Sequence, residues 1–284
     1  GSEMCIRDSY KKDIWENSDY LKKEINKFDG IIVRNKTNLN QSTLEKAANL
    51  KYIGRLGVGL DNIDTEYCKK NNIFVQPATG MNADSVAEYV LSSSLSLLKK
   101  TKLINEKTQS GQWPRTSITT NELKGKILGL IGFGDIAKKV LKLINAFEVT
   151  TIAFDPFITS QEMEENNVKK VTFENILSLA DIISIHVPLN NETKYLFDKK
   201  TFQKMNNKPI IINSSRGGII NETDILEAYK NNYISGFALD VYEHEPVNKI
   251  FLKNITNDMN CILSPHIAGV TEESNTRVSE FIMN

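Results

Sequence analysis

Apolar positions along the chain alternate between two periods, and this alternation predicts an α/β protein. Short runs of consecutive apolar residues, typical of parallel strands buried on both faces, are separated by segments with apolar residues at helical spacing. Ser42 to Glu45 has the form of a capping box at the start of one such helix. The first third of the chain therefore predicts a small unit with a parallel sheet. Its expected strands are 30–34, 52–56 and 73–75, and its expected helices are 19–28, 42–50 and 63–71.

A long helical pattern follows this small unit and leads into a second series of strands. It runs from about Asn82 to Trp113, and Ser85 to Glu88 has the form of a second capping box. The pattern after it predicts a doubly wound sheet of six strands with helices on both faces. The expected strands are 126–131, 149–154, 182–187, 209–213, 234–239 and 261–263, and the helices between them include 137–145, 173–179, 199–205 and 222–231.

The first strand of this second series runs into a glycine turn. Gly132 to Ala137 fits the pattern G-x-G-x-x-A. The first glycine allows a tight turn, Gly134 lets backbone amides approach a pyrophosphate, and the small Ala137 lets the next helix pack against the strand. A diphosphate would therefore lie at a helix N-terminus. Such turns are also common for purely structural reasons, so the turn alone leaves cofactor binding open.

Asp155 supplies a second signal for a dinucleotide. It ends the apolar stretch Val149 to Phe154 and falls about 20 residues after Gly134, the offset of the acidic residue that holds the ribose hydroxyls. Pro156 and Phe157 follow it, and neither could receive a 2′-phosphate as an Arg or Lys would. The two signals together predict NAD rather than NADP as the cofactor.

Composition narrows the class of protein further. The 284 residues, 40 % of them hydrophobic and 25 % charged, are enough for two domains of an ordinary globular protein. Lys+Arg 35 against Asp+Glu 35 gives no net charge, so nothing indicates a nucleic-acid partner. The apolar runs are too short for a membrane span and the N-terminus is too polar for a signal peptide. Cys5, Cys68 and Cys261 show no metal-ligand or disulfide spacing, which predicts no metal site and favours a reducing cytoplasm.

Three residues that follow predicted strands are candidates for chemistry: Arg216, Glu245 and His266. Ligands of doubly wound sheets bind at these strand ends. An Arg can pair bidentately with a carboxylate, a His can exchange a proton near neutral pH, and a carboxylate can orient the imidazole. Taken singly, each could instead be structural, and His186 also follows a strand. Their combination with a dinucleotide fold favours catalysis.

An ordered set of motifs resembles one family of enzymes. The motifs are Gly54 to Asp64, the turn at Gly132, His186 to Leu189, Asn213 to Gly218, Ala238 to Pro246 and Ser264 to Gly269. They are similar to those of the D-isomer-specific 2-hydroxyacid dehydrogenases, which include phosphoglycerate, glycerate and D-lactate dehydrogenases. The resemblance covers nearly all of Phe28 to Val278. Two stretches, Gly111 to Arg115 and His266 to Asn275, look most similar to 3-sulfolactate dehydrogenases.

This resemblance implies roles for the strand-end residues. Arg216 would bind the substrate carboxylate and polarise C2–O, while His266 would take the hydroxyl proton during oxidation or return it during reduction. Glu245 would hold His266 in the productive tautomer. Hydride would pass directly between substrate C2 and nicotinamide C4.

The resemblance also implies binding residues. Backbone amides around Val58 and Gly59 would bind the substrate carboxylate from the small domain. Arg34, Arg55 and Arg115 are candidates for a second anionic group on the substrate, and a surface salt bridge stays an equal alternative for each. Asp240 would meet the nicotinamide carboxamide. The remaining expected cofactor contacts are Gly132, Gly134, Asp135, Ile136, Asp155, Val187, Pro188, Ser214, Ser215 and Gly269.

The same resemblance implies a division into two domains. Residues 83–267 would form a Rossmann NAD-binding domain, and residues 1–82, with 268–284 returning to them, a smaller flavodoxin-like α/β substrate domain. Relatives begin with a strand and a helix before the stretch that matches 13–28, and these are missing here. We therefore expect the small domain to be incomplete at its N-terminus and short at its C-terminus, with an unrelated leader at 3–9. Asp135, where relatives often carry Arg, places an anion beside the expected pyrophosphate.

The sequence as a whole thus predicts a cytoplasmic NAD-dependent oxidoreductase. Its substrate would be a small anionic 2-hydroxy or 2-oxo acid, with 3-sulfolactate and 3-phosphoglycerate as candidates. It would form a homodimer through the helix 83–108 and the segment with Trp113, because that helix carries many apolar residues. Two alternatives stay open: a non-catalytic NAD(H)-sensing protein similar to corepressors of the same fold, and an inactive truncated fragment.

Overall fold

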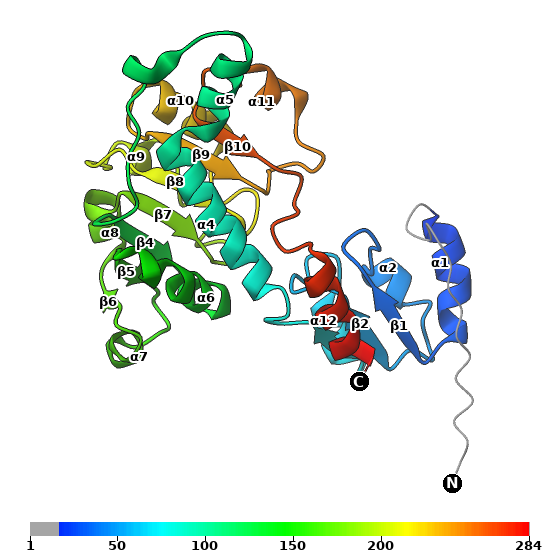
Figure 1. Cartoon of the computed structure of the whole chain (residues 1–284). Coiled ribbons are helices and arrows are strands. Elements are labelled where there is room, and N and C mark those ends of the chain that lie inside the picture. The colour runs from blue at the N-terminus through cyan, green and yellow to red at the C-terminus, as the bar shows by residue number, and fades with distance from the viewer. Residues whose placement is uncertain (1–16, 284) are drawn as a thin grey trace. The chain divides into compact units, whose positions relative to one another are not determined.

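The computed structural model describes residues 17–283, which divide into two compact units (Figure 1). One unit holds the described residues up to Asn82 together with those from Glu272 onward, and the other is Ala83–Thr271. The expected leader at 3–9 and Cys5 lie outside the described residues. None of the helices within 17–283 is long and apolar enough to cross a membrane.

The smaller unit is built on a three-stranded parallel sheet in the order β1-β2-β3. Buried apolar side chains such as Leu21, Leu44 and Ile53 form its core. Ile282, near the C-terminus, lies against the sheet at Gly54, where an added Cβ would be 2.5 Å from its Cγ2 atom. The strands are β1 (Gly30–Val33), β2 (Tyr52–Arg55) and β3 (Phe74–Pro77), and the helices are α1 (Ser18–Glu24), η2 (Ile25–Lys27), α2 (Gln41–Leu44), α3 (Thr65–Lys70) and α12 (Glu272–Met283).

The larger unit contains a seven-stranded parallel sheet in the order β10-β9-β8-β7-β4-β5-β6. The chain first moves outward from β4 through β5 to β6, then crosses over to β7 and continues to β10 on the other side, which confirms the doubly wound α/β fold. The prediction of six strands is wrong by one, because β6 consists of two lysines and shows no apolar run. The strands are β4 (Ile127–Ile131), β5 (Thr150–Phe154), β6 (Lys169–Lys170), β7 (Ile182–Ile185), β8 (Ile210–Asn213), β9 (Gly236–Leu239) and β10 (Cys261–Leu263).

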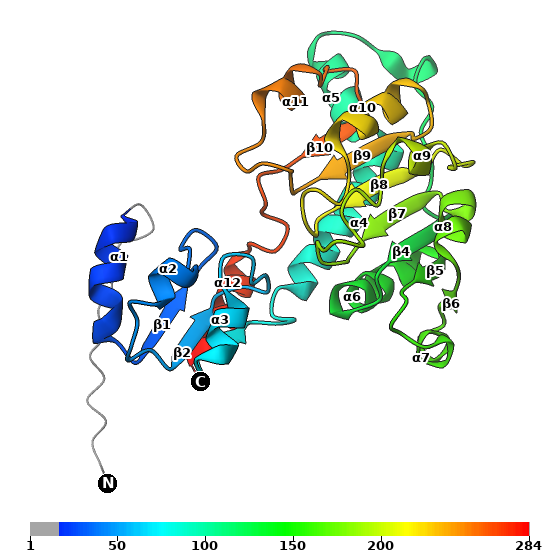
Figure 2. The ribbon, with the colours of Figure 1, turned by 180° about the vertical axis from the view of Figure 1, so that it is seen from behind.

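Helices cover both faces of this sheet. Residues of α4 and α6 pack with Leu128 and Leu130, whereas residues of α8 and α10 pack with Ile183 and Ile185. Accordingly, α4 crosses in front of the strands in Figure 1 and behind them in Figure 2. The helices are α4 (Ala83–Lys99), α5 (Thr101–Gln109), η3 (Pro114–Thr116), α6 (Asp135–Ile144), η4 (Asn145–Phe147), α7 (Ser160–Glu165), α8 (Phe173–Leu179), α9 (Lys199–Phe202), α10 (Glu222–Lys230) and α11 (Lys249–Lys253).

Three local predictions about helices are wrong. The long helix is divided in two, because Lys100 adopts a left-handed backbone with φ 51°. The capping box at Ser42 is replaced by Asn40, whose side chain accepts from the Thr43 amide at 3.1 Å, so Ser42 already lies in the first turn. Likewise α4 begins before Ser85, whose hydroxyl hydrogen-bonds Thr271 instead of capping the helix.

Candidate active site

The glycine turn lies between β4 and α6, as predicted. Gly132 has φ 89°, and a Cβ there would lie 2.6 Å from the His186 carbonyl oxygen, so only glycine fits. Gly134 is the N-cap of α6 without a side-chain cap, and a Cβ there would meet nothing within 4 Å. The space beside Gly134 is therefore open at the start of α6, where an anion can accept hydrogen bonds from the first amides of the helix.

Asp155 lies beside this turn because β5 is the neighbour of β4 in the sheet. One carboxylate oxygen accepts from the Phe133 amide at 2.9 Å and the other from the Phe157 amide at 2.8 Å. Each oxygen has a further acceptor position, so the carboxylate can still hold ribose hydroxyls. Asp135 is exposed and Ile136 half-buried at the start of α6, beside the same turn.

The exits of β7 and β8 supply the next predicted cofactor contacts. Val187 and Pro188 follow β7, while Ser214 and Ser215 follow β8. The Ser214 hydroxyl is buried and has no hydrogen-bond partner among residues 17–283. A buried hydroxyl without a partner is costly, which is consistent with a ligand group filling that role. With the open glycine turn and Asp155, it makes these residues fit a bound dinucleotide.

His266 and Glu245 form a hydrogen-bonded pair, with 2.8 Å between His266 Nδ1 and Glu245 Oε2. The two side chains keep 40 % and 37 % of their area exposed, so the pair is accessible from outside. Its geometry leaves the Nε2 edge of the imidazole for another partner. His266 itself has a left-handed backbone with φ 56°, which is uncommon for a residue other than glycine.

Arg216 leaves β8 next to the loop that carries Glu245. The buried Asn213 side chain shapes this exit, donating to the Arg216 carbonyl at 2.9 Å and accepting from the Ser215 amide at 3.1 Å. Gly217 then packs directly on Tyr242, since an added Cβ would overlap the Tyr242 carbonyl. The Arg216 loop and the loop after β9 are thus held against each other. Sequence reasoning assigned no role to Asn213, although a polar residue ending an isoleucine-rich strand was a usable signal.

Asp240, expected to meet the nicotinamide carboxamide, is 1 % exposed. Its carboxylate accepts from the Ser264 hydroxyl at 2.6 Å and from the amides of Ile267 and Ala268 at 2.9 and 2.8 Å. Its backbone carbonyl accepts from the His266 amide at 2.8 Å. Asp240 therefore holds the segment that carries His266 and leads to Gly269.

The candidates in the smaller unit differ in how they are placed. Arg55 is only 8 % exposed, and its guanidinium donates to the Leu56 carbonyl at 2.7 Å and to Asn62 Oδ1 at 3.3 Å. Arg34 is exposed at the end of β1, with Nη2 3.5 Å from Asn275 Oδ1. Val58 and Gly59 lie in the loop after β2. Arg34 is thus the more accessible of these two arginines.

The remaining candidates lie apart from this set. Arg115 is exposed in η3. His186 retains some accessible area, but the protein packed around its imidazole lowers its pKa to about 4, and Nε2 lies 2.9 Å from the Ser184 hydroxyl. This environment favours a neutral, structural histidine. No group of three or more His, Cys, Asp or Glu side chains in the described part of the chain is placed to hold a metal ion.

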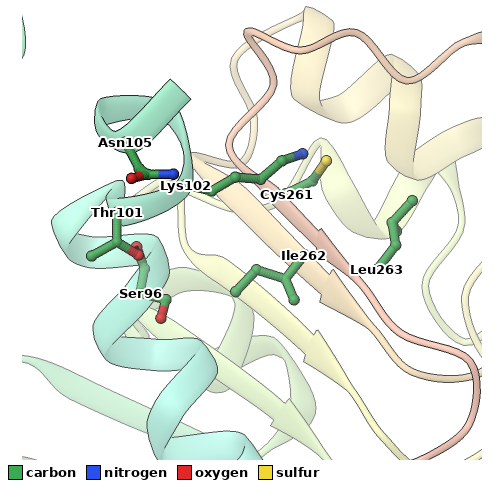
Figure 3. A pocket seen from close by; sticks show the side chains of 7 residues that line it. All are labelled: Ser96, Thr101, Lys102, Asn105, Cys261, Ile262 and Leu263. Atoms are coloured by element: carbon green, nitrogen blue, oxygen red, sulfur yellow. Dashed lines mark hydrogen bonds between the residues drawn. The ribbon is translucent and has the colours of Figure 1, made fainter. Parts of the chain in front are cut away.

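A pocket elsewhere on the larger unit is lined by none of the predicted site residues (Figure 3). Side chains from α4, α5 and the edge strand β10 face one another around it. They are Ser96, Thr101, Lys102, Asn105, Cys261, Ile262 and Leu263.

The fold and the glycine turn define the larger unit as a dinucleotide-binding module, and a hydrogen-bonded His266–Glu245 pair lies on loops that follow its strands. A comparison with protein families matches residues 91–268 to the family described as "D-isomer specific 2-hydroxyacid dehydrogenase, NAD binding domain". The chain belongs to this family, and its cofactor is NAD.

Individual relatives agree with this assignment. The chain is 37 % identical over 250 residues to (S)-sulfolactate dehydrogenase of Chromohalobacter salexigens, covering 88 % of this chain and 80 % of the relative. It is 35 % identical over 281 residues to D-3-phosphoglycerate dehydrogenase of Bacillus subtilis, covering 98 % of this chain but only 53 % of that relative. Among solved structures, D-lactate dehydrogenase from Aquifex aeolicus, complexed with NAD and lactic acid, superposes with a TM-score of 0.83 at 28 % identity, covering 92 % of this chain and 83 % of that one.

Proposed function

We propose that this protein is an NAD-dependent dehydrogenase that interconverts a 2-hydroxy acid and its 2-oxo acid. The observation that carries the proposal is the His266–Glu245 pair, 2.8 Å apart, on a unit that belongs to the NAD-binding family. A hydride-transfer enzyme must also move a proton at the same carbon–oxygen bond. An accessible imidazole oriented by a carboxylate suits that task.

The chain's own residues divide this task among them. The Arg216 guanidinium binds the substrate carboxylate bidentately and draws electron density from C2–O. His266 Nε2 accepts the hydroxyl proton as the hydride leaves C2, and donates it back in the reverse reaction. Glu245 accepts from Nδ1–H and so keeps Nε2 as the exchanging atom. The α6 amides, Asp155 and the Ser214 hydroxyl would hold NAD, which would supply the hydride acceptor when bound.

The smaller unit is proposed to take part in substrate binding, as a substrate domain. Backbone amides at Val58 and Gly59 would donate to the same carboxylate that Arg216 binds. Arg34, exposed at the end of β1, would bind a second anionic group such as a sulfonate or phosphate, with Arg115 as a further candidate. Arg55 would support the loop instead, because its guanidinium is bonded to Leu56 and Asn62. The names of the relatives make 3-sulfolactate and 3-phosphoglycerate the substrates to test first.

Location and assembly complete the proposal. Cys68 and Cys261 are both free and buried, which suits a cytoplasmic protein. The proposed homodimer needs a revised reason, because Val90 and Leu97 of α4 belong to the hydrophobic core of the larger unit itself. The support lies instead in α5, which has no buried residue, and in Trp113, which is 78 % exposed. Exposed aromatic residues of this kind often anchor interfaces.

A substrate panel tests the activity. NADH oxidation is followed with 3-sulfopyruvate, 3-phosphohydroxypyruvate, hydroxypyruvate, pyruvate and glyoxylate, each at several concentrations. We expect turnover with at least one of the doubly anionic acids, and a lower KM for it than for pyruvate. NADH binding without turnover of any acid would contradict the proposal and favour the sensing alternative.

A further inference from the structure

Two hydroxyl side chains of α4 make hydrogen bonds to the segment 264–271. Ser85 Oγ lies 2.9 Å from Thr271 Oγ1, and Tyr89 Oη lies 2.8 Å from Ser264 Oγ. The spacing of four residues places Ser85 and Tyr89 on one side of the helix. The segment that carries His266 is therefore fixed to α4 by hydroxyl hydrogen bonds at two points.

The direction of the second hydrogen bond can be worked out. The Ser264 hydroxyl donates its single proton to the Asp240 carboxylate, at 2.6 Å. Ser264 Oγ can then only accept, so the Tyr89 hydroxyl must be the donor. Burial raises the pKa of Tyr89, so the phenol keeps this proton at neutral pH. Tyr89 thus donates a hydrogen bond to Ser264, and Ser264 donates one to the Asp240 carboxylate.

This series of hydrogen bonds ends at the backbone just after His266, and it holds the Ser264 side chain just before His266. The Asp240 carboxylate that accepts from Ser264 also accepts from the amides of Ile267 and Ala268. His266 lies between these anchor points in a left-handed conformation, with φ 56°. Such a conformation is disfavoured for a residue with a Cβ, so it needs support from its surroundings. The hydrogen bonds to Asp240 provide that support.

We propose that Tyr89 is a positioning residue for His266, acting through Ser264 and Asp240. The proposal rests on the proposed function only for the role of His266 in proton transfer. Tyr89 is not among the residues expected to contact substrate or cofactor. Its hydroxyl fixes the Ser264 acceptor, which fixes the carboxylate that shapes the loop. Loss of that hydroxyl should loosen the loop and lower kcat while leaving NADH binding intact.

The test compares Tyr89→Phe, Ser264→Ala and the double variant with the unmutated chain. Tyr229→Phe is the matched control, since the Tyr229 hydroxyl accepts from the Asn260 amide at the other end of β10. Hydrogen–deuterium exchange of the 264–268 peptide and kcat, KM and the NADH dissociation constant are measured for each. Ser264→Thr, which keeps the hydroxyl, serves as the rescue variant.

We expect Tyr89→Phe to speed amide hydrogen–deuterium exchange at 264–268 and to lower kcat about five-fold. This is the size of effect expected from the loss of one hydrogen bond. The NADH dissociation constant should stay the same. Because Tyr89 and Ser264 act in the same series of hydrogen bonds, the double variant should have the same kcat and the same amide exchange as Ser264→Ala. Ser264→Thr should show the amide exchange of the unmutated protein.

Three results would overturn the proposal. They are exchange in Tyr89→Phe equal to that of the unmutated chain, additive losses in the double variant, or the same change at 264–268 in Tyr229→Phe. If the unmutated chain reduces no 2-oxo acid, the proposed function fails, whereas the exchange measurement still decides whether Tyr89 supports the loop.

Discussion

In the proposed reaction, Glu245 would act by orienting the His266 imidazole rather than through the strength of an ion pair. Like the surface pair Lys124–Glu148, they are partly open to solvent, and exposed ion pairs stabilise proteins by at most about 1 kcal/mol. What distinguishes the pair is that Glu245 also accepts from the Tyr242 amide, at 3.3 Å. The carboxylate is thereby tied to its own loop and fixes which imidazole nitrogen faces outward.

His186 should make stability depend on pH. Burial lowers its pKa to about 4 in the folded state, below the unfolded value of 6.5, so the unfolded chain binds the proton more readily. The free energy of unfolding therefore falls as pH is lowered between these values. The unmutated protein should lose more free energy of unfolding between pH 7 and pH 5 than His186→Gln, by about 2 kcal/mol, measured by urea unfolding. Equal losses in both proteins would contradict this environment for His186.

Asp155 should determine the choice between NADH and NADPH. Its carboxylate can accept from ribose hydroxyls and repel a 2′-phosphate, so NADH should bind much more tightly than NADPH. Asp155→Ala should narrow that difference by about ten-fold, measured by nucleotide fluorescence. Asp135→Asn is the matched control: it removes an exposed carboxylate at the pyrophosphate end and should tighten both cofactors alike. Equal affinities in the unmutated protein would rule out this role.

At the scale of elements, the sequence predicted those that have a strong apolar pattern. β4 and β10 were placed almost to the residue, but β6 was missed because Lys169 and Lys170 carry no pattern. The break at Lys100 was missed because a lysine gives no sign of a left-handed backbone. Asn and Ser are both favoured at helix N-caps, so the sequence could not show whether Asn40 or Ser42 caps α2.

The candidate site was predictable to a similar extent. Arg216, Glu245 and His266 follow three adjacent parallel strands, so the topology alone brings them to one edge. The hydrogen bond between Tyr89 and Ser264 could not be predicted, because the two residues are 175 positions apart in the sequence and their hydroxyls form no recognisable motif. The burial of Arg55 was equally invisible, since it depends on contacts with Leu56 and Asn62.

The two glycines of the turn should respond differently to alanine. Gly132→Ala forces a Cβ against the His186 carbonyl at φ 89°, which should lower the free energy of unfolding by about 2 kcal/mol. Gly134→Ala has φ −85° and meets no protein atom within 4 Å, so stability should be kept. Its methyl group would instead occupy space for the pyrophosphate and weaken NADH binding about ten-fold. Unchanged NADH affinity in Gly134→Ala would argue against a phosphate at this turn.

At the scale of the whole molecule, the chain contains two sheets that each have their own core. It enters the larger unit at Ala83 and leaves it after Thr271. The chain spans about half the length of the D-3-phosphoglycerate dehydrogenases that it resembles, but 80 % of the (S)-sulfolactate dehydrogenase. The alignments with these relatives are longer than the larger unit, so the similarity to the family extends to both units. The substrate has to be identified by measurement.

Assembly is a separate prediction at this scale. Light scattering at micromolar concentration should give the mass of a dimer, and Trp113→Ser should shift it toward the monomer by removing an exposed aromatic anchor. Ile250→Ser, which removes a side chain that is 71 % exposed on α11, is the control and should stay dimeric. A monomer mass for the unmutated chain would refute the dimer.

Whether His266 exchanges the proton with the substrate is tested by comparing His266→Ala with the unmutated protein, using the 2-oxo acid with the highest kcat/KM. If His266 supplies the proton, the variant should lose about a thousand-fold in kcat at every pH, within the range expected for general acid catalysis. Its NADH dissociation constant should be unchanged, because the imidazole acts on the substrate. Near-normal turnover in His266→Ala would contradict the account and show that the proton comes from another group.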